Sequence, residues 1–537
     1  MRPLFQKPSL QSPLTLAWLA ALWFGTACNW PLWQMMRQLP ELGDMRGLVF
    51  TFVFGAIVTV VTGALLSLLA WRIVFKPVMT VLLLSAGSLA YFMGSYGTVI
   101  DPTMIVNVLQ TDQREAADLL SVRLVLSLLI LGVMPAVWLW RRKLESAPFV
   151  RRLIINVLAF VAGIVAAVLL ALPVFADLSS TMRNHKQLRY MINPVNGVYS
   201  LGAVLFHSQR QPSGPPEVVG EDATLAPRAA GTKPPLMVLV VGETARAMNF
   251  SLLGYTKPTN PELAKLDVLA YAKAQSCGTS TAASLPCMFS VLGKEQYESL
   301  KKPQEGLMDV LQRAGLAVLW LDNQSGCKGV CERVPHEDLC KDDECMDEAL
   351  VNALPQALVN LAKLDPERVK RGVVIVLHQM GSHGPAYYKR SPKNLKPFMP
   401  ECESNALQQC PREQVVNGYD NSIVYTDHVL AGVIGWLKSQ EAAYAPAMLY
   451  MSDHGESLGE NGLYLHGVPY AFAPVEQTHV PAIVWLAESA AGFRDCAKTS
   501  LARPISHDFI SHTVMGYMGV RTALYKPEWD LLAPRCR

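Results

Sequence analysis

Residues 276–287, SCGTSTAASLPC, combine two cysteines with a run of hydroxyl side chains. The stretch has the composition of a helix start, where free backbone N–H groups attract anions. A hydroxyl there is a weak nucleophile until a metal ion or a base lowers its pKa. In the alternative interpretation, these residues only cap the helix. Composition does not choose among four candidate nucleophiles: Ser276, Thr279, Ser280 and Thr281.

Potential metal ligands follow several apolar runs further along the chain. Glu243 closes one run, and His378 and His383 follow another. Asp453 and His454 close a third. In an open α/β sheet, side chains at the carboxyl ends of the strands gather in one crevice. Carboxylates mixed with imidazoles suit Zn²⁺, and after it Mn²⁺, better than Mg²⁺ or Ca²⁺. Each residue alone could be a cap or a core polar group, so the prediction depends on their shared position.

The elements that must position these residues are short β-branched runs from about residue 235, alternating with helix-like segments. The runs are PLMVLVVGE, GLAVLWLDN, GVVIVLHQMGSH, AMLYMSDHGE and VPAIVWLA. This alternation predicts an α/β sheet with parallel strands. The preceding residues 207–235 are rich in Pro, Ala and Gly, and we interpret them as a linker or surface excursion.

A competing nucleophile is Ser457 in GESLG, which matches the G-x-S-x-G elbow of α/β-hydrolases. The elbow needs a helix directly after the serine, but residues 459–469 are rich in Gly and end in Pro. We therefore interpret Ser457 as a structural or supporting residue.

The first third of the chain contains five runs that are long and apolar enough to cross a bilayer as helices. They cover residues 14–36, 47–71, 77–96, 124–140 and 153–175. Lys and Arg gather before the first run, after the second and between the last two, and such loops stay cytoplasmic. The N-terminus is thus predicted inside and everything after Phe175 outside. A cleaved signal sequence is disfavoured because the first run is long for a signal core.

Cysteine usage points to the same location. Of eleven cysteines, ten follow residue 270. Even numbers at short spacing are typical of disulfides in an oxidising compartment. A zinc site in CKGVC and CKDDEC is disfavoured, because its spacings are looser than those of CxxC knuckles. The last pair is inferred from parity alone, and the expected pairs are Cys277/Cys287, Cys327/Cys331, Cys340/Cys345, Cys402/Cys410 and Cys496/Cys536.

Seven motifs together closely resemble the lipid A phosphoethanolamine transferases, the family that includes the mobilised colistin-resistance enzymes. They are VVGETAR, SCGTSTAASLPCMFS, DNQSGCKGVC, GSHGP, NGYDNSIVYTD, SDHGESLGE and LYLHG. The resemblance implies an α-helical membrane domain of five transmembrane helices and an α/β alkaline-phosphatase/sulfatase-like periplasmic catalytic domain. Sulfatases need a C/S-x-P-x-R context, which is absent around Thr281. The implied division is a transmembrane domain at 1–176, a bridging helix or linker at 177–234 and a transferase domain at 235–537.

The resemblance also implies roles for individual residues. It makes Thr281 the nucleophile and places it in the primary Zn²⁺ site with Glu243, Asp453 and His454. His383 and His466 match positions that bind a second zinc or the phosphoryl group, and either could act as acid or base. His378 has a counterpart but receives no role.

Five further residues match contacts to the phosphoethanolamine headgroup. Ser325 and Lys328 lie in the second half of the chain. Asn107, Thr111 and Glu115 follow one another at four-residue steps, which predicts one face of a helix in an external loop. A solvated helix face is the alternative explanation for that spacing.

The implied reaction transfers phosphoethanolamine from phosphatidylethanolamine to a lipid A phosphate through a phospho-threonine intermediate. In this hypothesis zinc activates the Thr281 hydroxyl, diacylglycerol leaves, and lipid A takes the group from the threonine. Colistin resistance would follow, because the added ammonium reduces the negative surface charge. We expect a multi-pass, monomeric protein of the bacterial inner membrane that needs zinc.

Two alternatives stay open. The same chemistry could serve another envelope acceptor, such as lipopolysaccharide core heptose, a protein or a glycan, because nothing in the sequence specifies the acceptor. A non-catalytic membrane receptor that retains the fold is disfavoured by the full ligand set. A nucleic-acid partner is not expected, because the formal net charge is +3 and no basic stripe with interleaved aromatics occurs.

Overall fold

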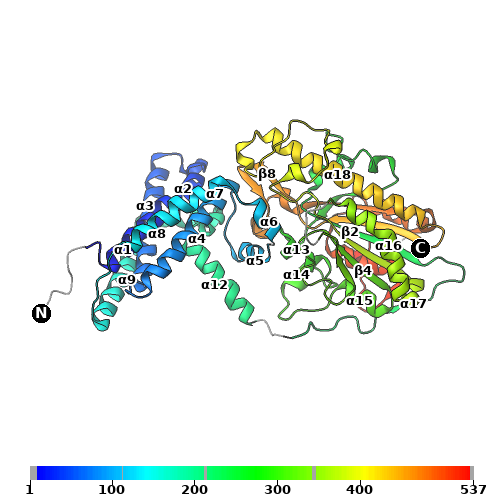
Figure 1. Ribbon diagram of the computed structural model, residues 1–537, viewed down its shortest axis with the longest axis horizontal. Helices are drawn as coiled ribbons and strands as arrows, with labels where there is room; N and C mark the ends of the chain where they lie inside the picture. Colours follow the sequence, from blue (N-terminus) through cyan, green and yellow to red (C-terminus); the bar gives the residue numbers. More distant parts are fainter. Residues whose placement is uncertain (1–8, 112, 211–213, 341–345, 533–537) are drawn as a thin grey trace. The chain divides into compact units, whose positions relative to one another are not determined.

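The computed structural model describes residues 9–111, 113–210, 214–340 and 346–532, with the backbone alone at 113–115, 207–210 and 496. The chain divides into two compact units (Figure 1). The first runs to Ile105 and includes Leu120–His207, and the second comprises Val106–Leu119 and continues from Ser208. The short segment Val106–Leu119 thus belongs with the second unit, although it lies between membrane helices in sequence.

The first unit is helical. Within the described residues, four stretches are long and apolar enough to cross a membrane: Met45–Leu68, Phe75–Tyr96, Val122–Trp140 and Phe149–Asn184. The third of these includes a π-helical segment at Leu128–Val133. The helices of this unit are α1 (Pro13–Trp23), α2 (Trp30–Arg37), α3 (Met45–Leu68), α4 (Phe75–Tyr96), α7 (Val122–Ser127), α8 (Met134–Trp140), α9 (Phe149–Ala171), α10 (Phe175–Asn184), α11 (Gln187–Tyr190) and α12 (Val195–Arg210).

The predicted span at 14–36 is not confirmed as a single crossing. The apolar helical stretch ends at Cys28, and α2 starts separately at Trp30. Pro31 lies in the first turn of α2, where its missing N–H costs nothing but where it cannot continue a preceding helix. The Asn29 side chain donates to the carbonyl of Phe24 at 2.8 Å and so satisfies a backbone acceptor near the end of the first helical stretch.

An eight-stranded sheet forms the centre of the second unit, in the order β11-β3-β10-β7-β2-β6-β4-β5. All five predicted runs are strands of this sheet. The strands are β2 (Pro235–Gly242), β3 (Leu269–Gln275), β4 (Ala317–Asp322), β5 (His336–Asp338), β6 (Val373–His378), β7 (Ala445–Ser452), β10 (His479–Leu486) and β11 (Ile505–Ser506).

The expectation of parallel strands is wrong for one of them, because β10 runs antiparallel to both of its neighbours, β7 and β3. Parallel neighbours require a long crossover connection, usually a helix, that carries the chain back to the starting edge. Between β7 and β10 the chain instead forms the hairpin of β8 (Ser457–Glu460) and β9 (Leu463–Leu465) and short helical turns.

Both faces of the sheet are buried, which explains why its strands are continuously apolar. Along β2, residues 237, 239 and 241 belong to one core, and residues 236, 238 and 240 belong to the other. Helices α13 (Thr281–Met288), α15 (Leu307–Ala314) and α21 (Asp508–Met518) supply the first core. Helices α16 (Glu348–Leu364) and α18 (Arg412–Ser439) supply the second.

Part of the predicted linker is integrated into this unit. Strand β1 (Thr224–Leu225) pairs antiparallel with β12 (Val520–Arg521) near the end of the chain. The Asp222 carboxylate accepts hydrogen bonds from the Thr522 hydroxyl at 2.7 Å and from the Ala523 backbone at 2.6 Å. The stretch is therefore more than a surface excursion, although its composition carries no strand pattern.

Three of the predicted disulfides are confirmed: Cys277–Cys287, Cys327–Cys331 and Cys402–Cys410. Cys340 is also disulfide-bonded, and its predicted partner Cys345 lies outside the described residues. The side chain of Cys496 and the whole of Cys536 lie outside them as well. The thiolate alternative for CKGVC is thereby excluded, because both of its sulfurs are oxidised.

Candidate functional site

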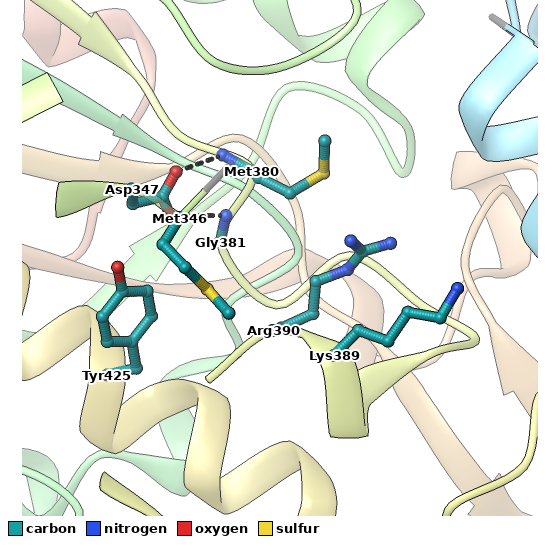
Figure 2. Close-up of a pocket in the computed structure, with 7 residues that line it drawn as sticks. All are labelled: Met346, Asp347, Met380, Gly381, Lys389, Arg390 and Tyr425. Carbon is teal, nitrogen blue, oxygen red and sulfur yellow. Dashed lines mark hydrogen bonds between the residues drawn. The ribbon is translucent and has the colours of Figure 1, made fainter. Parts of the chain in front are cut away.

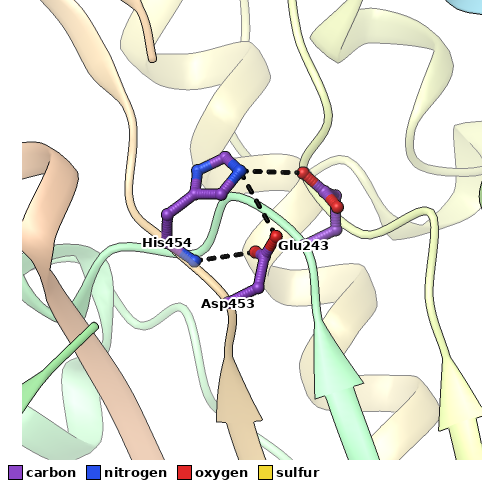
Figure 3. Close-up of side chains that lie close together, drawn as sticks. All are labelled: Glu243, Asp453 and His454. Atoms are coloured by element: carbon purple, nitrogen blue, oxygen red, sulfur yellow. Dashed lines mark hydrogen bonds and ion pairs between the residues drawn. The ribbon is translucent and has the colours of Figure 1, made fainter. Parts of the chain in front are cut away.

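Two adjacent strands bring three predicted ligands together. Glu243 directly follows β2, Asp453 and His454 directly follow β7, and these two strands pair in parallel. One ligand atom from each residue lies within 4.8 Å of the others. Figure 3 shows the three side chains pointing toward a common point, and all three are buried. The strand-end argument from the sequence thus identified these three neighbours correctly.

Thr281 occupies the fourth side of this cluster. It is the first residue of α13, and its Oγ1 donates to Glu243 Oε2 at 3.0 Å. The same oxygen lies 3.5 Å from His454 Nε2. The hydroxyls of Ser276 and Thr279 instead donate to backbone carbonyls. Thr281 is thus the candidate hydroxyl that bonds to the cluster, which composition could not show, and its role as nucleophile stays a prediction.

The donor atoms of the cluster fit a metal ion. Glu243 Oε1 and Asp453 Oδ2 are buried and have no hydrogen-bond donor among the described residues. They lie 3.4 and 3.3 Å from His454 Nε2. His454 Nδ1 lies 2.9 Å from the Gly455 carbonyl, which can only accept, so the neutral ring carries its lone pair on Nε2. Three lone pairs that converge on one point, with a hydroxyl beside them, suit four-coordinate binding.

The electrostatics of the cluster also call for a cation. Burial, together with the Glu243 carboxylate, raises the pKa of Asp453 to about 7. Burial alone would lower the pKa of His454, but the two carboxylates raise it to about 10. Two buried acids at this distance cannot both stay ionised without a positive charge between them. A bound metal ion supplies that charge, and a proton takes its place otherwise.

Two further predicted histidines stand beside the cluster. The ring of His466 lies 4.3 Å from the ring of His454 and 5.8 Å from that of His383. His466 Nδ1 pairs with Glu456 Oε2 at 3.1 Å. Burial and the neighbouring His454 lower the pKa of His466, which favours the neutral ring that can accept a proton or bind a metal. His466 therefore lies beside the predicted ligands with His383 next to it, and the roles of both rings stay predictions.

His378, a candidate ligand by its position after a strand, is not part of the cluster. Its Nδ1 pairs with Asp322 Oδ2 at 3.0 Å, and its ring packs edge-on against Trp320. Burial opposes ionisation of Asp322, but the charge and the hydrogen bond of His378 lower its pKa to about 2. The chain places this histidine in a core ion pair at the neighbouring strand ends.

Ser457 does not occupy a nucleophile elbow. It begins strand β8 rather than preceding a helix, and its hydroxyl accepts from Gln477 Nε2 at 2.9 Å. Gln477 also donates to the Leu465 carbonyl and accepts from the Val468 backbone. Ser457 thus helps to hold the loop on which His466 lies.

Gln324 is a site residue that sequence reasoning missed. Its Nε2 donates to Glu243 Oε2 at 3.1 Å, the oxygen that also accepts from Thr281. Ser325 follows it directly, and Lys328 Nζ donates to Ser325 Oγ at 2.9 Å. The predicted headgroup residues Ser325 and Lys328 therefore reach the metal cluster through Gln324. The available signal was its position at the end of β4.

The prediction of one helix face through Asn107, Thr111 and Glu115 is wrong in its geometry. Helix α5 (Pro102–Gln110) ends before Thr111, and α6 (Gln113–Asp118) starts separately. The backbone N–H and the hydroxyl of Thr111 both donate to the Asn107 carbonyl at 2.8 Å, which closes the last turn. The side chain of Glu115 lies outside the described residues. The headgroup role of these residues stays a prediction.

His507 joins the loop before Thr281 to the strand before Asp453. Its Nδ1 accepts from the Cys277 backbone N–H at 2.9 Å, and its Nε2 donates to the Ser452 carbonyl at 2.9 Å. Burial lowers the pKa of His507 to about 3, so the ring is neutral and keeps this tautomer at physiological pH. It fixes the spacing between the loop before Thr281 and the strand end before Asp453.

We expect His507→Ala to lower the transfer rate by about tenfold or more, because a small shift of the Thr281 loop misaligns the attack. The two buried backbone groups also lose their partner, which costs about 1–3 kcal/mol each. Turnover and the melting temperature of the purified protein measure both effects. His479→Ala, which removes a more exposed ring bonded to the Ala272 carbonyl, serves as the control. Unchanged turnover in His507→Ala would refute this role.

Comparison with known proteins gives consistent matches. The sulfatase family model matches residues 235–520, and the model for phosphoethanolamine transferase EptA/EptB matches residues 58–208. Phosphoethanolamine transferase EptA of Escherichia coli K12 is 38% identical, over 99% of this chain and 98% of its own. Phosphatidylethanolamine transferase Mcr-1 of Escherichia coli is 38% identical over 94% of each chain. The solved structure of lipooligosaccharide phosphoethanolamine transferase A from Neisseria meningitidis aligns with a TM-score of 0.91 at 31% identity, covering 96% of this chain and 98% of that one.

Proposed function

The chain belongs to the lipid A phosphoethanolamine transferase family, and we propose that it transfers phosphoethanolamine from phosphatidylethanolamine to a lipid A phosphate through a covalent intermediate on Thr281. It is a multi-pass membrane protein with an alkaline-phosphatase/sulfatase-like catalytic unit in the periplasm. The observation that carries the mechanistic proposal is the approach of Thr281 Oγ1 to within 3.0 Å of Glu243 in a buried ligand cluster.

Glu243, Asp453, His454 and Thr281 would hold a zinc ion. Their mixture of carboxylate, imidazole and hydroxyl donors, with two carboxylate oxygens that accept no hydrogen bond from the described residues, matches zinc better than magnesium or calcium. When bound, zinc lowers the pKa of the threonine hydroxyl and offsets negative charge on the phosphoryl oxygens. His383 and His466 would bind the phosphoryl group or a second zinc.

The chain's own residues perform the remaining steps. Thr281 Oγ1 attacks the phosphorus of phosphatidylethanolamine, and its proton points toward Glu243 Oε2. The bond from phosphorus to the diacylglycerol oxygen breaks. A neutral ring of the His383–His466 pair takes up the proton that Thr281 releases and, as an imidazolium, delivers it to this oxygen. The N-terminus of α13 favours the negative charge that develops beside Thr281.

The second half of the reaction reverses the first at the same atoms. A protonated phosphate group of lipid A attacks the phosphorus through its oxygen, the bond to Thr281 Oγ1 breaks, and the proton of that phosphate passes through the same imidazole pair to the threonine oxygen. Ser325 and Lys328 would contact the phosphoethanolamine, and Gln324 keeps the Glu243 carboxylate oriented during both steps. Transfer adds an ammonium group to lipid A and lowers the attraction for cationic peptides, from which colistin resistance follows.

The test is a reconstituted assay with the full chain, phosphatidylethanolamine and three acceptors offered separately: lipid A, a core oligosaccharide bearing heptose, and water alone. We expect phosphoethanolamine on lipid A, with no comparable product on the oligosaccharide. Transfer to heptose in preference to lipid A would refute lipid A as the acceptor but would leave the proposed transfer chemistry standing. Absence of diacylglycerol release with every acceptor would refute the enzymatic function and favour a non-catalytic receptor.

A further inference from the structure

Arg390 connects His383 to a carboxylate from a distant part of the chain. Arg390 Nε donates to the backbone carbonyl of His383 at 2.8 Å, and Arg390 Nη2 contacts Asp118 Oδ2 at 2.8 Å. Lys389 Nζ contacts the other oxygen, Asp118 Oδ1, at 2.6 Å. The side chains of Arg390 and Asp118 are only 4% and 9% exposed. The buried Asp118 carboxylate thus pairs with two cations. One of them, Arg390, is also bonded to the backbone of His383.

Asp118 lies in Val106–Leu119, the segment of the second unit that carries Asn107 and Thr111. Its backbone carbonyl accepts from Asn405 Nδ2 at 2.6 Å. Earlier in the segment, the carbonyl of Gln110 accepts from Lys328 Nζ at 3.4 Å. Hydrogen bonds therefore connect the segment to the rest of the unit at Asp118 and at Gln110. The bond at Gln110 comes from Lys328, a predicted headgroup residue.

The loop before His383 is held from a second side. Asp347 accepts from the backbone N–H groups of Met380 and Gly381, both at 2.9 Å, and Figure 2 shows these bonds in a pocket that Arg390 also lines. Gly381 has a φ of 52°, and a side chain there would meet the Glu243 carbonyl at 2.8 Å. The loop therefore lies directly against the backbone of Glu243, a predicted metal ligand, so a shift of the loop would displace this residue.

We propose that Asp118 is a positioning residue for transfer: its carboxylate docks segment 106–119 onto the catalytic unit and, through Arg390, fixes the backbone of His383. This inference rests on the proposed function, because it assumes that His383 acts at the phosphoryl group. If the ion pair were purely structural, its loss would lower only the stability of the protein. A positioning residue changes the kinetics of a protein that stays folded.

The test compares the full-length wild type with Asp118→Asn, Asp118→Glu, Arg390→Met and the double variant Asp118→Asn/Arg390→Met. Diacylglycerol release from phosphatidylethanolamine gives kcat and KM, and thermal unfolding gives the folded fraction. We expect Asp118→Asn to lower kcat/KM by about tenfold or more, because misplacement of a site group by an ångström has at least that effect. KM for the donor should rise and kcat should fall, and Asp118→Glu should restore most of the loss.

The double variant should be no worse than the poorer single variant, because both changes cut the same chain of contacts. Amide hydrogen exchange provides a readout that does not depend on Arg390→Met folding. Exchange in residues 106–111 and 116–119 should accelerate in Asp118→Asn. Glu367→Gln, which alters an exposed carboxylate paired with Lys370, should leave kinetics and exchange unchanged.

A kcat/KM of Asp118→Asn within twofold of wild type would overturn the proposal. So would a loss explained entirely by a smaller folded fraction, or fully additive losses in the double variant. Thr281→Ala is measured in parallel. If it stays active, the proposed function fails; if it is inactive while Asp118→Asn is normal, only the positioning role fails.

Discussion

Thr281→Ala is expected to abolish transfer, with turnover reduced by roughly a thousandfold or more, because removal of a covalent nucleophile leaves only binding and electrostatic effects. Thr281 Oγ1 is the only hydroxyl among the described residues of 276–287 that bonds to the ligand cluster. Diacylglycerol release by the purified variant measures the chemical step. Lipid A from a Gram-negative host expressing the variant should lack phosphoethanolamine, and the host should remain susceptible to polymyxin.

Ser280→Ala is the matched control for this change. Ser280 precedes α13 as its N-cap residue but makes no side-chain cap hydrogen bond, so the helix start should survive the substitution. We expect near-normal transfer from it. Lipid A modified equally by Thr281→Ala and wild type would show that the nucleophile is another residue.

Asp453→Asn is expected to remove both the bound metal and the activity. Asp453 Oδ1 already accepts from the His454 and Thr244 backbone N–H groups at 2.7 and 3.2 Å, and an amide oxygen can keep those bonds. The amide NH₂ then replaces Oδ2, the oxygen with no donor, and an NH₂ group cannot bind a cation. We expect zinc content per protein to fall below half and turnover to fall by about a hundredfold or more.

Asp427→Asn provides the comparison for this experiment. Asp427 is equally buried in the same unit, but its oxygens accept from the Glu262 and Leu263 backbones. It should retain zinc even where its stability falls. Asp453→Asn with full zinc content and normal turnover would contradict the metal assignment.

The convergence of Glu243, Asp453 and His454 could be predicted because its signal is local. Glu243 and the Asp453–His454 pair each follow an apolar run, and the parallel pairing of β2 with β7 places them side by side. Every residue of these strands is buried or nearly so, which is why the runs are recognisable without periodicity. The short disulfides were predictable for a similar reason, since close spacing limits the choice of partners.

Other features depend on contacts between distant residues and left no local signal. The choice of Thr281 over its neighbours depends on which hydroxyl faces Glu243 once β2 and α13 are in place. The direction of β10 depends on the length and content of its connection rather than on its own apolar residues. Gln324 and Arg390 are ordinary polar residues in the sequence, and only the fold reveals that they bond to Glu243 and to the His383 backbone.

The membrane third shows the same division between local and distant causes. Hydropathy identified four long apolar helices within the described residues, because that signal is contained in each segment. The interruption at Asn29 was missed because its side chain is satisfied by Phe24 and by Asn193, which lies far along the chain. A polar residue in an apolar run is compatible with a spanning helix until such partners are known.

The covalent intermediate on Thr281 is tested most directly by mass spectrometry of the peptide that contains it, after incubation of the full chain with phosphatidylethanolamine in the absence of lipid A. We expect a phosphoethanolamine adduct located on Thr281, which disappears when lipid A is added. An unmodified peptide in a preparation that transfers the group to lipid A, or an adduct on another residue, would contradict this intermediate.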